Sequence, residues 1–155
     1  MNTHLHPGTA LITGASSGIG AVYADRLARS GYDLILVARR ADRLRALAQD
    51  ITSRTGRSVE AVSADLLDAV DLAKVEMLLK RDASITMLVN NAGIGATAPL
   101  LGSDIGDMER MITLNVNVLT RLAYAAAPAF VGRGQGTIIN IASVVALAPE
   151  LLNGV

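Results

Sequence analysis

The segment TGASSGIG, residues 13 to 20, has the glycine pattern of a turn that binds phosphate, with Gly14, Gly18 and Gly20. Glycines in such a turn permit positive φ, let a phosphate group approach the backbone, and allow the next helix to pack closely on a sheet. The N–H groups and the positive dipole end at the start of that helix favour an anion. The turn therefore predicts a site for a phosphate group of a dinucleotide. No Lys-Ser or Lys-Thr pair follows the last glycine, which argues against the phosphate loop of kinases and GTPases.

Ser143 follows a second apolar run, TIINIA at residues 137 to 142, and also stands where chemistry is expected. If that run is a strand, its carboxyl end is the side on which α/β folds place ligands. A nucleophilic serine needs a base, and no histidine occurs after His6, so a serine hydrolase is not supported. His4 and His6 alternate and could bind a metal, but a solvated terminal tail is the favoured interpretation, and we predict no metal site.

Apolar runs that alternate with amphipathic segments must position these residues. LILVA, residues 34 to 38, and TIINIA are apolar at successive positions, so both faces of their sheet must be covered, as in a parallel α/β sheet. We therefore expect an α/β fold, a Rossmann-like doubly wound parallel sheet with its function at the strand-to-helix turns. The expected strands are 9–13, 33–38, 58–63, 86–90 and 137–142, and the expected helices are 18–30, 42–54, 68–82 and a long one within 104–131.

The composition excludes several classes of function. The 155 residues suffice for a single domain, 1–155, with its own core. Fourteen basic and fourteen acidic residues cancel and only 3% of the residues are aromatic, which argues against binding of nucleic acid. No apolar stretch is long enough to cross a membrane, and the first residues lack the features of a secretory signal. Without cysteine there is no disulfide or thiolate nucleophile, and we expect a cytoplasmic protein.

The glycine spacing is Gly-x-x-x-Gly-x-Gly, and in this the sequence resembles the short-chain dehydrogenase/reductase family. Further landmarks of the family follow in order. Asp65 comes after the third expected strand, NNAG at residues 90 to 93 after the fourth, Asn115 lies in the long helix, and Ser143 follows the fifth strand. Five ordered landmarks are far more specific than any one of them, and the resemblance covers essentially the whole chain.

The end of the second expected strand, VARR at residues 37 to 40, bears on the choice of cofactor. Ala38 stands where dinucleotide folds that bind NAD carry an acidic residue for the adenosine ribose. Arg39 and Arg40 follow, and a guanidinium can form paired, charge-assisted hydrogen bonds to phosphate. We therefore predict NADP(H) rather than NAD(H), with Arg39 as the phosphate ligand. The alternative is that both arginines are solvated charges at the start of a helix, an interpretation that suits Arg40 better than Arg39.

The resemblance also implies the residues that hold the cofactor. The residue matching Asp65 touches adenine, aided by the backbone of Leu66, although a helix cap is an alternative role that Asp68 could fill instead. The NNAG segment is implied to be mainly structural, its amides bracing the central strands while Gly93 lets the adenosine ribose approach closely. The implied cofactor-binding residues are Gly14, Ser16, Ser17, Gly18, Ile19, Gly20, Arg39, Asp65, Leu66, Asn91, Ala92 and Gly93.

The resemblance makes Ser143 and Asn115 the catalytic candidates. Ser143 would hold and polarise the substrate oxygen, and the residue matching Asn115 holds a water that relays protons. An asparagine within an apolar helix must also pair its amide, so the alternative role for Asn115 is that of a structural residue that distorts the helix locally. Asn117, two residues on, is expected on another face without a role.

The family's general acid or base is the tyrosine of a Tyr-x-x-x-Lys pair, whose lysine lowers the tyrosine pKa. None of Tyr23, Tyr32 and Tyr124 has a lysine four residues on. The tyrosine would fall just beyond Val155, and the fifth strand is too apolar for an exposed sheet edge. We therefore expect the chain to be the cofactor-binding part of a longer protein.

For that intact protein the sequence predicts an oxidoreductase that moves hydride between NADP(H) and a small carbonyl or alcohol substrate. Family resemblance implies a homodimer or homotetramer. A non-enzymatic NADP(H)-binding or sensor domain is the main alternative, and a structural subunit with a vestigial glycine turn is a weaker one.

Overall fold

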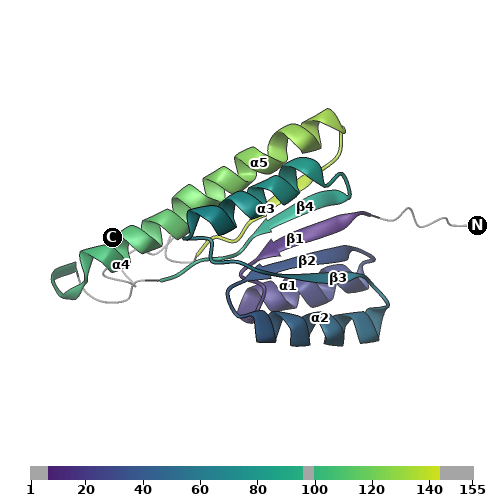
Figure 1. The fold of residues 1–155 in the computed structure, drawn as a ribbon, viewed down its shortest axis with the longest axis horizontal. Coiled ribbons are helices and arrows are strands. Elements are labelled where there is room, and N and C mark those ends of the chain that lie inside the picture. The colour runs from purple at the N-terminus through teal and green to yellow at the C-terminus, as the bar shows by residue number, and fades with distance from the viewer. Residues whose placement is uncertain (1–6, 96–99, 144–155) are drawn as a thin grey trace, which may run out of the picture.

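Five parallel strands form one sheet in the computed structural model, which describes residues 7–95 and 100–143 (Figure 1). The strand order is β3-β2-β1-β4-β5, so the chain moves outward from β1 to one edge and then returns to build the other half. This is the doubly wound arrangement that the sequence predicts. The strands are β1 (Thr9–Thr13), β2 (Asp33–Ala38), β3 (Val59–Ser63), β4 (Ile85–Asn90) and β5 (Thr137–Asn140).

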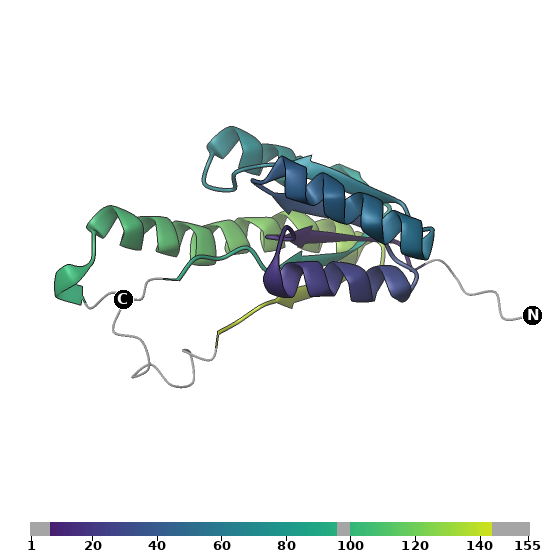
Figure 2. The same ribbon diagram turned by 90° about the horizontal axis from the view of Figure 1, so that it is seen from below.

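Helices cover both faces of the sheet (Figures 1 and 2). α1 (Gly18–Arg29) and α2 (Ala41–Thr55) lie on one face, and α3 (Ala69–Arg81) and α5 (Leu119–Gly132) lie on the other. Neighbouring residues of β1 enter different cores, because Ala10 and Ile12 pack with the α1–α2 side and Leu11 packs with the α3–α5 side. The unbroken apolar pattern of the strands is the direct result of these two cores.

The long helix expected within residues 104–131 is divided into three segments. α4 (Ile105–Ile112) is followed by a π-helix, η2 (Thr113–Val118), which leads directly into α5. Together they form a rod that extends past the carboxyl ends of the strands (Figures 1 and 2). A short 3₁₀ turn, η1 (Leu100–Gly102), precedes α4. The widened turn surrounds Asn115, as expected if a paired asparagine distorts a helix.

The predicted bounds of the first two strands agree with the structure, whereas the fifth strand ends two residues early. Asn140 of β5 pairs with Asn90, which is the last residue of β4. The residues after Asn140 therefore have no further residue of β4 to pair with, and β5 ends there. One more bond, from the Ile141 N–H to the Asn90 carbonyl, closes the end at 2.9 Å. Within the described ranges, no helix is both long and apolar enough to cross a lipid bilayer.

Candidate functional site

The glycine turn between β1 and α1 is shaped by crowding as well as by backbone dihedrals. Gly14 has φ +66, and a Cβ placed on it would lie 2.8 Å from the Ala92 Cα. A Cβ on Gly20 would lie 2.5 Å from the Asn91 side-chain nitrogen. α1 then begins at Gly18, and its N-cap residue, Ser17, makes no side-chain cap. The first N–H groups of α1 are therefore not capped by that hydroxyl, as suits an anion-binding helix end.

Asn91 and Thr13 hold this turn against the end of β4. The Asn91 Nδ2 donates to the carbonyl oxygens of Thr13 and Gly14, at 2.9 and 3.2 Å. The buried Thr13 Oγ1 accepts from the backbone N–H groups of Asn91 and Ala92, both at 3.0 Å. Asn91 therefore braces the central strands, as predicted for the NNAG segment.

A cleft of about 360 Å³ lies beside the turn, at the carboxyl ends of the strands. Its walls come from the glycine turn, the ends of β2 and β3, the loop after β4, and the α4–η2 junction. The predicted site residues that line it are Gly14, Ser16, Ser17, Arg39, Asp65, Leu66, Ala92 and Gly93. Of the remaining predicted residues, Asn91 supports the turn from behind, and Gly18 and Ile19 line a separate groove along α1.

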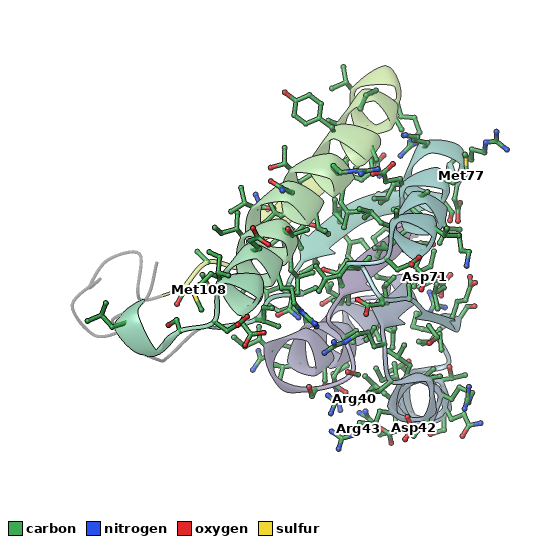
Figure 3. All side chains as sticks on the ribbon, turned by 60° about the vertical axis from the view of Figure 1, so that its left-hand side comes forward. Arg40, Asp42, Arg43, Asp71, Met77 and Met108 are labelled. Atoms are coloured by element: carbon green, nitrogen blue, oxygen red, sulfur yellow. The ribbon has the colours of Figure 1, made fainter. Side chains whose placement is uncertain are left out.

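Arg40 takes a position that the sequence did not favour. Its Nη2 donates to the hydroxyl oxygens of Ser16 and Ser17, at 3.2 and 2.9 Å, and so joins the end of β2 to the glycine turn. Figure 3 shows Arg40 at the start of α2, beside α1. Arg39 lines the same cleft, and its backbone carbonyl accepts from the Ser63 hydroxyl at 3.2 Å. Arg40 is exposed at the N-cap of α2, as the interpretation of a solvated charge at the start of a helix expects, and it also reaches the glycine turn, because β1 and β2 are neighbours and bring the two serines to it.

Asp65 lies on the cleft wall beyond β3 and is not the cap of α3. Asp68 caps that helix by accepting from the N–H groups of Val70 and Asp71, both at 2.9 Å. The Asp65 Oδ1 instead accepts from the Leu67 N–H at 3.1 Å, while its own N–H donates to Asp71. The Lys74 ammonium, and after it this Asp65 N–H, hold the pKa of Asp71 below its usual range. These bonds fix the loop that carries Asp65 into the cleft.

Asn115 ties the π-helix to the loop after β4. Its Oδ1 accepts from the Ile94 N–H at 3.1 Å, and its Nδ2 donates to the Ile94 carbonyl at 2.8 Å. A Cβ on Gly93 would lie 3.1 Å from the same Oδ1, so glycine there lets the amide approach. The amide side chain makes one hydrogen bond through each of its ends, and the pair of bonds holds the π-helix to the loop after β4.

Ser143 is exposed beyond the end of β5 and does not line the cleft. The nearby strand ends carry two more asparagines, and the Asn90 Nδ2 donates to the Asn140 Oδ1 at 3.0 Å. Asn90 is buried, and within residues 7–95 and 100–143 its Oδ1 has no hydrogen-bond partner. None of Tyr23, Tyr32 and Tyr124 lines the cleft. His4 and His6 lie outside the described residues.

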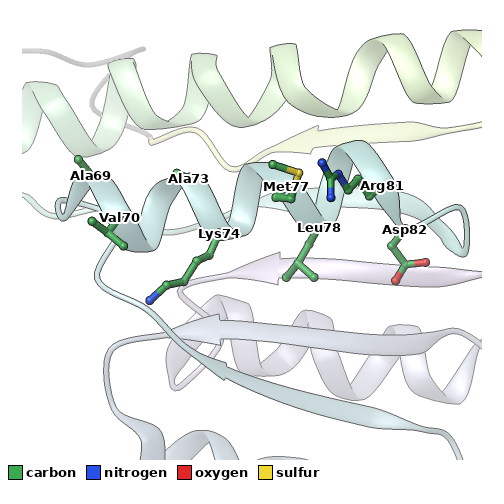
Figure 4. A pocket seen from close by; sticks show the side chains of 8 residues that line it. All are labelled: Ala69, Val70, Ala73, Lys74, Met77, Leu78, Arg81 and Asp82. Atoms are coloured by element: carbon green, nitrogen blue, oxygen red, sulfur yellow. The ribbon is translucent and has the colours of Figure 1, made fainter.

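A larger, mostly apolar depression of about 900 Å³ runs along α3 (Figure 4). Every residue that lines it belongs to α3 or is its C-cap, Asp82. Met77 lies on the outer side of the helix (Figure 3). The depression receives no residue from a strand end or from the glycine turn, so we assign the chemistry to the smaller cleft.

Comparison with known proteins identifies the family of the chain. A model of the family described as short chain dehydrogenase matches residues 8–155. A very-long-chain 3-oxoacyl-CoA reductase of Coccidioides immitis is 35% identical over 148 residues, which are 92% of this chain and 42% of that protein.

Two solved structures superpose closely, each with a TM-score of 0.92. A short-chain dehydrogenase from Sphingobium yanoikuyae in complex with NADPH is 52% identical, with 94% of this chain and 58% of that one covered. The bulky-bulky ketone specific alcohol dehydrogenase from Comamonas testosteroni is 46% identical, with 95% and 59% covered. The chain thus spans about half the length of the proteins it matches.

Proposed function

The chain belongs to the short-chain dehydrogenase family, and from this premise we propose that it forms the NADP(H)-binding part of an oxidoreductase. The proposed reaction of the intact protein moves hydride between the nicotinamide and a small carbonyl or alcohol substrate. The bound nicotinamide supplies the hydride chemistry, and the protein supplies binding, orientation and proton handling. Residues 1–155 are proposed to be one dinucleotide-binding domain, and assembly into a homodimer or homotetramer is part of the same proposal.

The observation that carries the choice of NADP(H) is the pair of arginines at the end of β2. Arg40 is already oriented over the glycine turn by Ser16 and Ser17, and Arg39 lines the same cleft. Ala38 supplies no carboxylate that would repel a 2′-phosphate. A guanidinium held in place loses little freedom when it binds phosphate, so a preformed arginine favours the phosphorylated cofactor. The NADPH complex of the Sphingobium yanoikuyae relative supports this choice.

The remaining predicted residues fit the rest of such a cofactor. The glycine turn, residues 14 to 20, with Ser16, Ser17 and Ile19, would hold the diphosphate at the start of α1, where a side chain on Gly14 or Gly20 would collide with the β4 end. Asp65 and Leu66 would face the adenine. Asn91, Ala92 and Gly93 would lie along the adenosine ribose.

Two residues are proposed for the reaction itself. Ser143, beyond β5, would donate a hydrogen bond to the substrate oxygen and polarise it. Asn115, fixed beside the loop after β4 by its two bonds to Ile94, would hold a water that relays protons. The proton donor of the family is a Tyr-x-x-x-Lys pair, which these 155 residues do not contain. We propose that sequence outside them supplies it.

Titration with NADPH and NADH tests the cofactor assignment directly. Each charged hydrogen bond to the 2′-phosphate contributes about 1.5–3 kcal/mol, so calorimetry should show NADPH binding at least roughly tenfold tighter than NADH. A folded protein that binds neither, or that prefers NADH, would overturn the proposal. For the reaction, the longer natural protein is screened for NADPH oxidation with aldehydes and ketones. Tight binding without any turnover across that screen would favour the sensor alternative.

A further inference from the structure

We propose that Arg110 of α4 binds the adenine ring of the cofactor, stacking its guanidinium on one face of the ring while Asp65 lies at the ring's edge. This inference rests on the proposed function, because it assigns one more residue to the same cleft. It makes Arg110 a determinant of affinity for any adenine dinucleotide rather than a ligand of the 2′-phosphate.

Arg110 reaches the cleft from a different element of the fold than the one that carries Arg39 and Arg40. It lies in the last turn of α4, and Leu114, four residues on in the π-helix, lines the same wall. Arg39 and Arg40 come from the end of β2, whereas α4 belongs to the rod beyond the strand ends. The cleft therefore has arginines on two separate walls.

The backbone that carries Arg110 is fixed at both ends. Asp104 caps α4 by accepting from the N–H groups of Gly106 and Asp107, at 2.8 and 3.2 Å. On the other side, Asn115 is bonded twice to Ile94. Between these anchors Met108 is buried while Arg110 is exposed, so α4 turns its charged side chain away from the packed face. Such a support positions an arginine without burying it.

Arg110 and Asp65 line one cleft with opposite charges, yet no ion pair joins them in the part of the chain that the structure describes. The Asp65 Oδ1 accepts from the Leu67 N–H. Its Oδ2 accepts no hydrogen bond from the residues that the structure describes. A flat ring with an exocyclic amine satisfies both groups at once. The amine donates to the Asp65 carboxylate, and the face of the ring receives the guanidinium.

The phosphates of the cofactor already have partners elsewhere. Ser16, Ser17 and Arg40 surround the start of α1, and Arg39 stands at the end of β2. The cleft that Arg110 and Leu114 line is also lined by the apolar residues Ala64 and Leu66, which follow β3. A slot between apolar side chains and a planar cation suits an aromatic base better than a second phosphate.

The test is Arg110→Met, which keeps an unbranched apolar stem and removes the charged, planar guanidinium. Calorimetric Kd values for NADPH and NADH are measured for both proteins, because the two cofactors share adenine and differ only in the 2′-phosphate. We expect the variant to bind both cofactors more weakly by the same factor, roughly threefold to thirtyfold. Arg45→Met, an exposed arginine of α2 that does not line the cleft, is the control for loss of one positive charge and should leave both values unchanged.

Two results would overturn the inference while leaving the proposed function intact. The first is a variant that binds both cofactors as the original protein does. The second is a loss confined to NADPH, which would place Arg110 on the 2′-phosphate. If the unchanged protein binds neither cofactor, the proposed function fails and this inference fails with it. Circular dichroism and thermal unfolding of Arg110→Met establish that the variant is folded.

Discussion

The two halves of the sheet are held together in different ways. In the half made by β1, β2 and β3, the turn residues are glycines and small hydroxyl residues, and β1 is buried along its whole length. In the half made by β4 and β5, Asn90, Asn91 and Asn140 bond across the strand ends, Asn115 bonds the π-helix to the loop after β4, and the ends of β5 are exposed. The first half lines the cleft with its glycine turn and two arginines. In the second half, amide side chains hold the elements of the cleft wall together without lining it, so changes in the two halves should have different consequences.

The largest expected effect concerns the glycine turn of the first half. Gly14→Ala should lower the free energy of unfolding by about 2–5 kcal/mol, because it adds a left-handed backbone penalty to a collision with Ala92. Gly18→Ala is the matched control, since Gly18 has φ +57 but no atom within 4 Å of the added Cβ. It should cost only about 1–2 kcal/mol. Urea unfolding measures both, and equal losses would show that crowding does not shape the turn.

In the second half, the corresponding test is the paired amide of Asn115. Asn115→Ala removes two hydrogen bonds to Ile94 and should lower the free energy of unfolding by about 2–3 kcal/mol. Asn117→Ala, an exposed residue two positions on in the same π-helix, should cost less than about 0.5 kcal/mol. If the two variants unfold alike, the amide does not hold the β4 loop to the π-helix.

Arg40, at the end of β2 in the first half, is expected to affect cofactor binding rather than stability. Arg40→Met should weaken NADPH binding roughly tenfold and leave NADH binding nearly unchanged, because it removes the proposed ligand of the 2′-phosphate, while the exposed hydroxyls of Ser16 and Ser17 can bond to water instead. Arg43→Met is the control. Arg43 lies in the first turn of α2 (Figure 3) and does not line the cleft, so its replacement should change the affinity for neither cofactor. Equal weakening of both cofactors by Arg40→Met would remove the case for a 2′-phosphate site at the β2 end.

The smallest effect is expected from the charges that join α1 to α2. Asp25 contacts Arg29 at 2.8 Å and Arg54 at 2.6 Å, and these guanidinium groups hold the pKa of Asp25 below its usual range. A lowered folded-state pKa adds stability above the ordinary carboxyl pKa of about 3.9, and that stability is lost as the pH falls through the lower folded value. Asp25→Asn should therefore have a lower urea midpoint than the original protein at pH 7, and the two midpoints should converge in acid, once the pH has fallen below the lowered pKa of Asp25. A gap that persists in acid would assign the effect to packing.

The sequence predicted the strands of the first half more closely than the π-helix and the end of β5 in the second half. The bounds of β1 and β2 agree with the prediction because unbroken apolar runs flanked by glycine or charge leave little freedom in placing a buried strand. The π-helix at Asn115 and the early end of β5 depend on partners that sequence patterns do not name, Ile94 and the last residue of β4. Periodicity predicts one long helix there, and only the tertiary contact explains why it widens.

The sequence predicted some residues of the candidate site and missed others. Landmark spacing placed Gly14, Asp65 and Gly93 in the cleft, because each lies in the turn or loop that follows a strand. The contact of Arg40 with the glycine turn and the place of Arg110 in the cleft were missed, since both depend on which elements become neighbours in space. Arg40 meets Ser17 across 23 residues of sequence, and Arg110 reaches the cleft from a separate layer. Adjacent parallel strands β1 and β2 were the available signal for Arg40, and no local pattern signals Arg110.

The π-helix carries a consequence for how this part of the molecule can vary. A π turn holds one residue more than the α turn it replaces, as though a single residue had been inserted into a continuous helix. Removing one residue between Thr113 and Val118 would restore the α-helix and turn everything before it by about 100° about its axis. The side chains that α4 presents to the cleft would then be exchanged for a different set while α5 kept its place in the core. The gain or loss of a single codon there would thus change which side chains of α4 line the cleft and would leave the sheet as it is.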